Sequence, residues 1–401
     1  MIKNKIEIGT LILAILLVSM TLIPAASAQE EKDYSVTVEE AFKHANAHMI
    51  SFIAADAPGF ENWTGASIDT KPLELYDISG QKLFYQFSVY KENELIGTID
   101  VCAEKTQGPS IYDIKFDPEP YSVDEAMTKA KEIANTKYPD GKIKSTVMVV
   151  YSYPKVGAMT TVKDKATGEE YRIFVDAYSL EEVQDNPINK TRFGDLGVWS
   201  LYETMLENDM EENLAAWQKS DEFTKSIEEI ITNEGINNSA TLTEQDIKKI
   251  SSDVTIKTVT SKTLSVPAYT QETDYYCVPT SIQMLCEYFN DPSTTPTQTY
   301  IFNYLGGLED FGLSYSDIEE WVEDVWDKTP TVRTSGLYNI DVVTEIDNNR
   351  PFFSMISGHC RVCRGYLNSG YFYEYINDPL TGSAAYESTY GGPETGRVYV
   401  R

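Results

Sequence analysis

Residues 266–289 read Val266-Pro-Ala-Tyr-Thr-Gln271-Glu-Thr-Asp-Tyr-Tyr-Cys277-Val-Pro-Thr-Ser281-Ile-Gln-Met-Leu-Cys286-Glu-Tyr-Phe289, and this stretch decides how the last third of the chain folds. A loop carrying Gln271 leads to Cys277, and apolar residues then recur every three or four positions, which predicts an amphipathic helix. Pro279 falls in the first turn, where a missing N–H costs nothing. Cys277 is therefore expected at the positive end of a helix, which favours a thiolate. A buried structural cysteine is the alternative interpretation.

A histidine and a carboxylate further along the chain complete a candidate catalytic group. The chain holds three histidines, and His359 is the only one that follows Cys277. His359 opens the first of two strand patterns that flank a turn. If the hairpin turns between Asn368 and Ser369, His359 lies directly opposite Asp378, within reach of a hydrogen bond. A thiol, an imidazole and an orienting carboxylate are the parts of a catalytic triad.

These motifs resemble the papain-like cysteine peptidases, and most closely the branch of bacteriocin-processing (double-glycine) peptidases. That branch combines an apolar-Pro pair, a Gln six positions before Cys-Gly-Pro-x-Ser, a later Gly-His and an Asp-Pro. The matching stretches here are Val266-Pro267, Gln271, Cys277-Val-Pro-Thr-Ser281, Gly358-His359 and Asn377-Asp378-Pro379. The resemblance covers residues 263–401, a usual size for one domain.

The resemblance implies a role for each of these residues. Cys277 is implied as the nucleophile, His359 as the base and Asp378 as the residue that orients the base. Gln271 is implied as an oxyanion-hole donor through its side-chain amide, beside the Cys277 backbone N–H. The family usually has Gly after the cysteine, whereas this chain has Val278. The implied activity is hydrolysis of a protein or peptide substrate, and we expect neither a cofactor nor a metal.

Two other functions are compatible with the same residues. A cell-envelope amidase or transpeptidase uses the same triad, and analysis of products separates transfer to an added amine from hydrolysis. A catalytically inactive papain-like frame would instead be a binding protein, and Val278 is the residue that gives this alternative weight. Selective labelling of Cys277 at mildly acidic pH separates an activated thiolate from an inert thiol.

The first 28 residues have the pattern of a secretory signal peptide. Lys3 and Lys5 precede an apolar stretch over 8–23, and the segment 24–28 supplies small residues for cleavage. The apolar stretch is short for a membrane span and ends in Pro. We therefore expect a secreted or cell-surface protein without a stable membrane anchor after cleavage.

Composition limits the partners and the cysteine chemistry. The net charge of −29 argues against nonspecific binding to nucleic acid or anionic lipid. Five cysteines are too few for a disulfide scaffold. Cys360 and Cys363 are spaced like a metal knuckle or redox pair, but residues three apart on a strand point to opposite faces. We expect them to be independent core residues.

The sequence predicts an α+β protein with three regions after residue 28. Residues 29–185 contain a helical pattern followed by strand patterns, twice in succession, which indicates helices packed on antiparallel sheets. This region resembles the cystatin-like or PepSY-like modules that accompany secreted proteases, so we expect it to contact the catalytic domain as a pro-segment or inhibitor would. Residues 186–252 are predicted to form a helical connector, and residues 253–401 the papain-like catalytic domain.

Three local predictions are open to a direct structural check. The connector is predicted to be helical from Phe193 onward, and residues 254–260 to form a strand. The helix over 315–326 is predicted to begin at a cap formed by Ser316 and Glu319. His44 and His48 have the spacing of a two-histidine zinc motif, but Ala45 stands where a zinc protease carries its general base. We therefore expect both histidines to be helix-surface or half-buried residues rather than metal ligands.

Overall fold

The computed structural model describes residues 33–187, 192–194, 197–206, 209–236, 242–308, 311–390 and 392–401. The predicted signal peptide lies outside these residues. Contacts between residues group 36–401 into one unit. No helix in the described ranges is long and apolar enough to cross a membrane.

The amino-terminal region begins with a helix packed on an antiparallel sheet. Helix α2 starts where the Thr37 hydroxyl accepts the N–H of Glu40, a standard amino-terminal cap. It packs on the strands that follow it along the chain. The elements are α2 (Val38–Ala54), β1 (Ser67–Ile68), β2 (Leu73–Asp77), β3 (Lys82–Lys91), β4 (Glu94–Cys102), the 3₁₀ helix η1 (Lys105–Gln107) and β5 (Ile111–Phe116).

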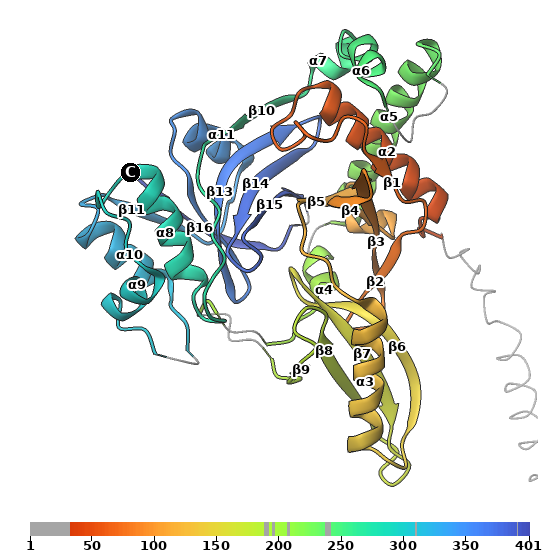
Figure 1. Cartoon of the computed structure of the whole chain (residues 1–401), viewed down its shortest axis with the longest axis vertical. Helices are drawn as coiled ribbons and strands as arrows, with labels where there is room; N and C mark the ends of the chain where they lie inside the picture. Colours follow the sequence, from red (N-terminus) through yellow and green to blue (C-terminus); the bar gives the residue numbers. More distant parts are fainter. Residues whose placement is uncertain are drawn as a thin grey trace, which may run out of the picture. The chain divides into compact units, whose positions relative to one another are not determined.

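The same order of elements repeats once, as the sequence predicts. Helix α3 packs on the three strands β6, β7 and β8 (Figure 1). The elements are α3 (Val123–Lys137), β6 (Lys142–Ser152), β7 (Lys155–Lys163), β8 (Glu170–Asp176) and β9 (Glu182–Val183). Strand β2 pairs in parallel with β6, which joins the two repeats into one sheet. The helical and strand patterns of the sequence thus identified these elements, and the strands are buried along most of their length.

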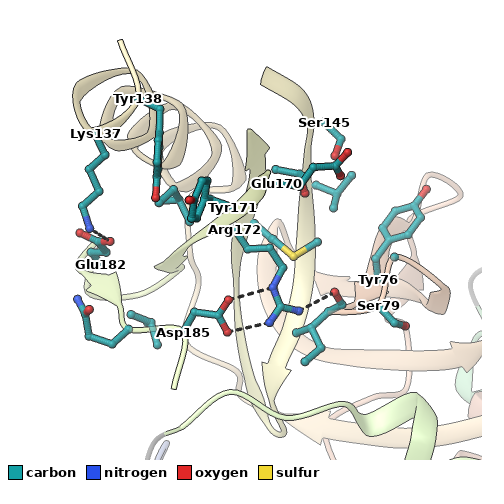
Figure 2. A pocket seen from close by; sticks show the side chains of 18 of the residues that line it. Tyr76, Ser79, Lys137, Tyr138, Ser145, Glu170, Tyr171, Arg172, Glu182 and Asp185 are labelled. Carbon is teal, nitrogen blue, oxygen red and sulfur yellow. Dashed lines mark hydrogen bonds and ion pairs between the residues drawn. The ribbon is translucent and has the colours of Figure 1, made fainter. Parts of the chain in front are cut away.

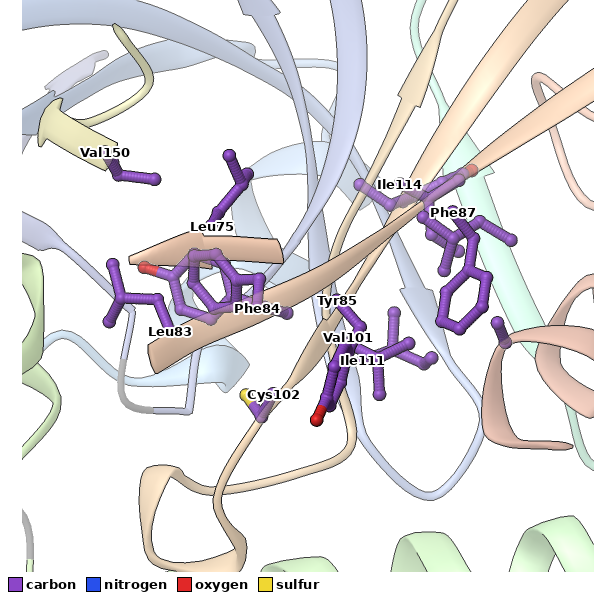
Figure 3. Close-up of a cluster of buried hydrophobic side chains, with 14 of the residues drawn as sticks. Leu75, Leu83, Phe84, Tyr85, Phe87, Val101, Cys102, Ile111, Ile114 and Val150 are labelled. Carbon is purple, nitrogen blue, oxygen red and sulfur yellow. The ribbon is translucent and has the colours of Figure 1, made fainter. Parts of the chain in front are cut away.

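The core of the first repeat consists of large apolar side chains from neighbouring strands. Figure 3 shows Leu75, Phe84, Phe87 and Ile114 among them, and each is fully buried. Side chains on one face of adjacent strands pack against each other, and this packing is what stabilises a sheet.

The connector is helical in part, and two predictions about this part of the chain are wrong. The connector contains α4 (Leu201–Met205), α5 (Met210–Asn233) and α6 (Glu244–Ile250), and α7 (Val254–Lys257) follows it. Phe193 is not helical but forms an antiparallel bridge with Leu313. The predicted strand over 254–260 is a short helix instead, because the Asp253 carboxylate caps it by accepting the N–H of Thr255.

The carboxy-terminal domain places helices before a sheet. The elements are β10 (Thr260–Thr263), α8 (Cys277–Phe289), α9 (Gln298–Tyr304), α10 (Tyr315–Asp324), β11 (Pro330–Arg333), α11 (Asn339–Asp347), β12 (Phe352–Ile356), β13 (His359–Asn368), β14 (Phe372–Asp378), β15 (Ser383–Ser388) and β16 (Glu394–Val400). The predicted cap of α10 is wrong by two residues, because Ser314 and Asp317 form the capping box. The helix also ends at Asp324, before the predicted Trp326.

One mixed sheet contains strands of both the amino-terminal region and the carboxy-terminal domain. Its strand order is β11-β16-β12-β13-β14-β15-β5-β4-β3-β2-β6-β7-β8-β9. Strand β15 of the carboxy-terminal domain pairs antiparallel with β5 of the amino-terminal region, with Glu387 opposite Asp113 (Figure 1). Backbone hydrogen bonds thus join the two parts of the α+β fold at the edges of their sheets.

His44 and His48 lie on α2, on the side that faces α5. Both are buried, whereas helix-surface or half-buried residues were predicted from the sequence. His44 shares a hydrogen bond of 2.8 Å with the Thr224 hydroxyl, and His48 Nδ1 lies 2.9 Å from the His44 carbonyl oxygen. His48 packs against the rings of Phe52 and Phe223. Burial lowers the pKa of His44 to about 4 and that of His48 to about 3.

These two histidines predict a loss of stability in mild acid. An unfolded histidine has a pKa of about 6.5, so below that pH the unfolded chain binds protons that buried His48 does not. The free energy of unfolding should therefore fall as the pH drops from 6.5 toward 3. We expect His48→Leu to remove about 2 kcal/mol of the loss that occurs between pH 6.5 and 4.5. Urea unfolding at both pH values measures this, and an unchanged pH dependence in the variant would contradict it.

Candidate active site

Cys277 is the first residue of α8, as the sequence predicts. Helix α8 packs on β13, and the Ser281 hydroxyl donates to the Cys360 carbonyl oxygen at 3.3 Å. The Cys277 side chain is 0% exposed. Val278 is also fully buried, within the hydrophobic core of the carboxy-terminal domain. The side chain that departs from the family pattern therefore packs into the domain interior.

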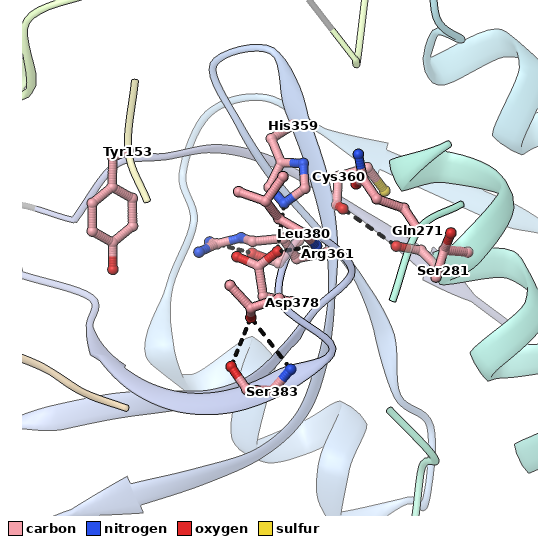
Figure 4. A network of polar contacts seen from close by, with 12 residues as sticks. Tyr153, Gln271, Ser281, His359, Cys360, Arg361, Asp378, Leu380 and Ser383 are labelled. Atoms are coloured by element: carbon pink, nitrogen blue, oxygen red, sulfur yellow. Dashed lines mark hydrogen bonds and ion pairs between the residues drawn. The ribbon is translucent and has the colours of Figure 1, made fainter. Parts of the chain in front are cut away.

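His359 and Asp378 are hydrogen-bonded, with His359 Nε2 2.7 Å from Asp378 Oδ1 (Figure 4). The register that produces this contact differs from the predicted one. Val362 lies opposite Asn377, so the next step places Arg361, not His359, opposite Asp378. His359 is the diagonal neighbour of Asp378 on the same face, a separation that an imidazole and a carboxylate can span.

A longer turn shifts the register by three residues, and a bulge then reverses the shift by one. Strand β13 extends to Asn368, which pairs with Phe372, so the turn is longer than predicted. A bulge also interrupts the pairing between Cys363 and Gly365. A Cβ at Gly365 would lie 2.6 Å from the Lys262 carbonyl oxygen, so glycine allows the close approach of β10 there.

His359 is held as a buried cation. Burial alone would lower the pKa of His359, but the charge and hydrogen bond of Asp378, followed by a hydrogen bond with Cys277, raise it to about 9. The pKa of Asp378 is lowered despite its burial, because His359 and Arg361 stabilise the carboxylate. The His359 imidazole thus interacts with both the Cys277 thiol and the Asp378 carboxylate.

The surroundings of Asp378 include residues that sequence reasoning missed. Leu380 donates its backbone N–H to Asp378 Oδ1 at 2.8 Å. Arg361 is buried nearby and binds both oxygens of Glu387 at 2.5 Å. Glu387 also accepts from the hydroxyl of Tyr153, which belongs to the amino-terminal region. An arginine inside an otherwise apolar strand pattern was the available signal, since buried charges are paired.

Gln271 has its side-chain donors engaged within its own loop. Its Nε2 donates to the carbonyl oxygens of Thr273 at 2.9 Å and Asp274 at 3.2 Å. Its backbone N–H donates to Pro379 O at 2.7 Å, which ties the loop to the segment after Asp378. The side-chain oxygen Oε1 is buried without a hydrogen-bond partner. An oxyanion would have to compete with the two loop carbonyls for the Nε2 hydrogens.

The five cysteines are free and buried. The thiol of Cys360 is influenced mainly by burial and then by Cys277, whereas Cys363 is influenced by burial and then by Glu374, and both pKa values are raised. These different surroundings fit the expectation that they point to opposite faces. Within the described part of the chain, no group of three or more His, Cys, Asp or Glu side chains could hold a metal ion.

A pocket of about 740 Å³ lies away from these residues. It is lined by β2, by β6–β9 and by the end of α3, and Arg172 and Asp185 on its wall form an ion pair (Figure 2). A smaller hollow of about 570 Å³ is lined by residues 271–275 and Leu380, beside the candidate site. Chemistry rather than cavity size therefore identifies the site, because Cys277, His359 and Asp378 interact with one another although none of them lines either hollow.

Comparison with known families gives one match. Residues 263–397, about a third of the chain, match the model of the Peptidase_C39 like family. No curated protein matches the chain. The match begins at β10 and ends in β16, so it spans the sheet and helices that position Cys277, His359 and Asp378.

Proposed function

From the premise that residues 263–397 belong to the Peptidase_C39 like family of papain-like cysteine peptidases, we propose that this chain is a secreted cysteine peptidase. Cys277 is the nucleophile, His359 the base and Asp378 the residue that orients the base. The observation that carries the proposal is the 2.7 Å hydrogen bond between His359 and Asp378, together with the interaction of the same imidazole with Cys277. A nucleophile, a base within its reach and a group that orients the base are what acyl transfer needs.

The proposed reaction passes through a thioester. The Cys277 thiolate, stabilised by the imidazolium and by the start of α8, attacks a peptide carbonyl carbon. His359 donates its proton to the leaving amine as the C–N bond breaks. Water then attacks the thioester, His359 takes a proton from it, and the thiol and a carboxylic acid are released. Asp378 keeps the imidazole oriented throughout, because its carboxylate accepts the Nε2–H.

Gln271 is proposed as an oxyanion donor, and this role predicts a kinetic effect. Its Nε2 would turn from the Thr273 and Asp274 carbonyls toward the oxyanion that forms on attack. We expect Gln271→Ala to lower kcat by roughly 10²–10³-fold, the usual cost of losing one such donor. A Gln271→Ala enzyme that keeps full turnover would remove Gln271 from the mechanism. The exposed neighbour Glu272 offers a control, since Glu272→Ala changes the same loop without touching the proposed donor.

A peptide-library digest tests the proposed activity. Purified chain is incubated with a mixed peptide library beside a Cys277→Ala chain, and new termini are identified by mass spectrometry. We expect cleavage by the wild-type chain alone. Transfer of the acyl group to an added amine in place of hydrolysis would instead identify an amidase or transpeptidase, and no reaction with either chain would favour a binding protein.

No observation in the structure favours either alternative. The Val278 side chain, which gave weight to an inactive frame, packs in the core. Secretion is supported by the basic, apolar and small-residue pattern of residues 1–28. Mass determination of the amino terminus of the exported protein tests it, with Gln29 as the expected first residue.

A further inference from the structure

A buried arginine lies beside the carboxylate that bonds to His359. The pairing of Val362 with Asn377 places Arg361 next to Asp378 on the neighbouring strand (Figure 4). Burial would raise the pKa of Asp378, but His359 and then Arg361 lower it. Arg361 therefore helps Asp378 to stay ionised, which is the state that the proposed mechanism uses.

Glu387 holds the Arg361 guanidinium in place. Arg361 Nη1 lies 2.5 Å from both carboxylate oxygens of Glu387, and Nη2 lies 3.4 Å from the Ser354 hydroxyl. The two charged side chains are only 1% and 8% exposed. A buried charge is costly without its partner, so the ion pair is not easily broken. Because Nε is buried without a hydrogen-bond partner, the position of the guanidinium depends mainly on Glu387.

Glu387 is in turn held by the amino-terminal region. The Tyr153 hydroxyl lies 3.1 Å from Glu387 Oε1 and 2.8 Å from Asp113 Oδ2. Tyr153 is 3% exposed and follows β6, whereas Asp113 belongs to β5. Glu387 also lies opposite Asp113 where β15 pairs with β5. Two segments of the amino-terminal region thus meet one carboxylate of the carboxy-terminal domain.

A cation on β5 continues the row of charged side chains. Lys115 Nζ lies 3.2 Å from Asp113 and 3.0 Å from Asp100. Burial and then repulsion by Asp100 raise the pKa of Asp113 to about 8, and Lys115 opposes this rise. Charged and polar side chains thus lead from the proposed active site into the amino-terminal region. In order, they are Asp378, Arg361, Glu387, Tyr153, Asp113 and Lys115.

We infer that Arg361 is a positioning residue of the proposed peptidase, and that the amino-terminal region holds it in place through Tyr153 and Glu387. Arg361 acts on Asp378, and Asp378 orients His359. The amino-terminal region is therefore a working part of the active site rather than a segment that is removed on activation. This inference rests on the proposed peptidase activity.

The position of Arg361 gives a direction for the pH dependence of catalysis. His359 and Arg361 are the cations that stabilise ionised Asp378, while Glu387 and Tyr153 act on Arg361. Without the guanidinium, Asp378 keeps only His359 as a stabilising cation, so its pKa rises and it takes up a proton at higher pH. The acidic limb of kcat/KM should therefore move to higher pH.

Two variants of the full chain without its signal peptide test the inference. In the double variant Arg361→Gln with Glu387→Gln, neither buried charge is left unpaired, so the domain should fold. We expect its acidic limb of kcat/KM at higher pH than that of wild type. Tyr153→Phe removes one hydroxyl and keeps the ring. We expect it to lower kcat by roughly 2–30-fold, the usual effect of one residue in a coupled network, with KM unchanged.

Tyr151→Phe is the matched control. Tyr151 lies two residues earlier, is 1% exposed, and its hydroxyl also bonds to a buried carboxylate, that of Asp176, at 2.7 Å. It should lose as much stability as Tyr153→Phe in thermal unfolding, which also shows that each variant is folded. Its kcat and pH profile should nevertheless match those of wild type.

The outcomes separate the inference from the proposed function. Equal kcat in Tyr153→Phe and Tyr151→Phe, or an unmoved acidic limb in the double variant, would overturn the inference while wild-type cleavage of library peptides leaves the peptidase activity standing. Absence of cleavage by the wild-type chain would contradict the proposed function, and the inference with it.

Discussion

Replacing Cys277 by alanine is expected to lower peptide hydrolysis by roughly 10⁴–10⁶-fold, because removal of the proposed nucleophile leaves only binding and oxyanion stabilisation. The thiol is the only group in the proposed site that can form the acyl intermediate. The substitution removes one sulfur from a buried position, so we expect it to lower the free energy of unfolding by about 1 kcal/mol. Initial rates on a peptide identified in the library digest, followed over several hours, measure the loss.

Cys286 provides the control for this experiment. It lies on the same helix, is also fully buried, and burial raises its pKa to about 12, so it is an inert thiol. Cys286→Ala should match the small stability change of Cys277→Ala while keeping full activity. Equal activity of wild type and Cys277→Ala would show that the observed hydrolysis does not use this thiol.

Replacing Asp378 by asparagine is expected to lower kcat/KM by roughly 10²–10⁴-fold without unfolding the protein. The carboxylate accepts the Nε2–H of His359 and holds the imidazole in one orientation. Leu380 N–H and His359 Nε2 bond to the same oxygen, Asp378 Oδ1. An asparagine that keeps its amide oxygen at this position can accept both hydrogen bonds, so the local backbone should survive, but it lacks the negative charge that stabilises the imidazolium.

The pH profile distinguishes this role from a purely structural one. With Asp378 present the pKa of His359 is about 9, so the imidazolium persists until the pH rises through that value. In Asp378→Asn the main cause of the raised pKa is gone, and burial then lowers the pKa. The alkaline limb of kcat/KM should therefore move to lower pH in the variant. An unchanged alkaline limb with reduced activity would argue that Asp378 acts through folding alone.

The pairing of β5 with β15 connects the amino-terminal region to the proposed active site. Glu387 lies opposite Asp113 across this junction and binds Arg361, whose charge helps to keep Asp378 ionised. Tyr153 donates to both Asp113 and Glu387 at 2.8 and 3.1 Å. A change in the amino-terminal region can therefore reach the carboxylate through buried, charge-assisted hydrogen bonds.

Local patterns in the sequence were sufficient to predict most helices and strands. Helix α8 begins at Cys277 because Pro279 and the apolar face that follows both suit a first turn and a buried helix. The repeats of helix and strands before residue 185 were likewise visible as periodic patterns. These signals are local, so they specify an element without saying what lies beside it.

The long-range pairing of backbone segments could not be predicted from the sequence. The predicted register of β13 and β14 assumed a tight turn, whereas Asn368 pairs with Phe372. It also did not include the bulge near Gly365, where the Lys262 carbonyl of β10 lies close. The helical connector was predicted to begin at Phe193, yet the backbone of Phe193 pairs with Leu313. Such errors are expected where tertiary contacts override local propensity.

The proposed mechanism requires the His359 imidazole to interact with both the Cys277 thiol and the Asp378 carboxylate. NMR of the three histidines tests this requirement most directly. Imidazole ¹⁵N shifts are followed from pH 5 to 10 in wild type, Cys277→Ala and Asp378→Asn. We predict that His359 alone is protonated at pH 7 and titrates near pH 9, while His44 and His48 stay neutral, and that both variants lower the His359 pKa. A His359 that is neutral at pH 7, or one whose titration is the same in all three proteins, would contradict the account.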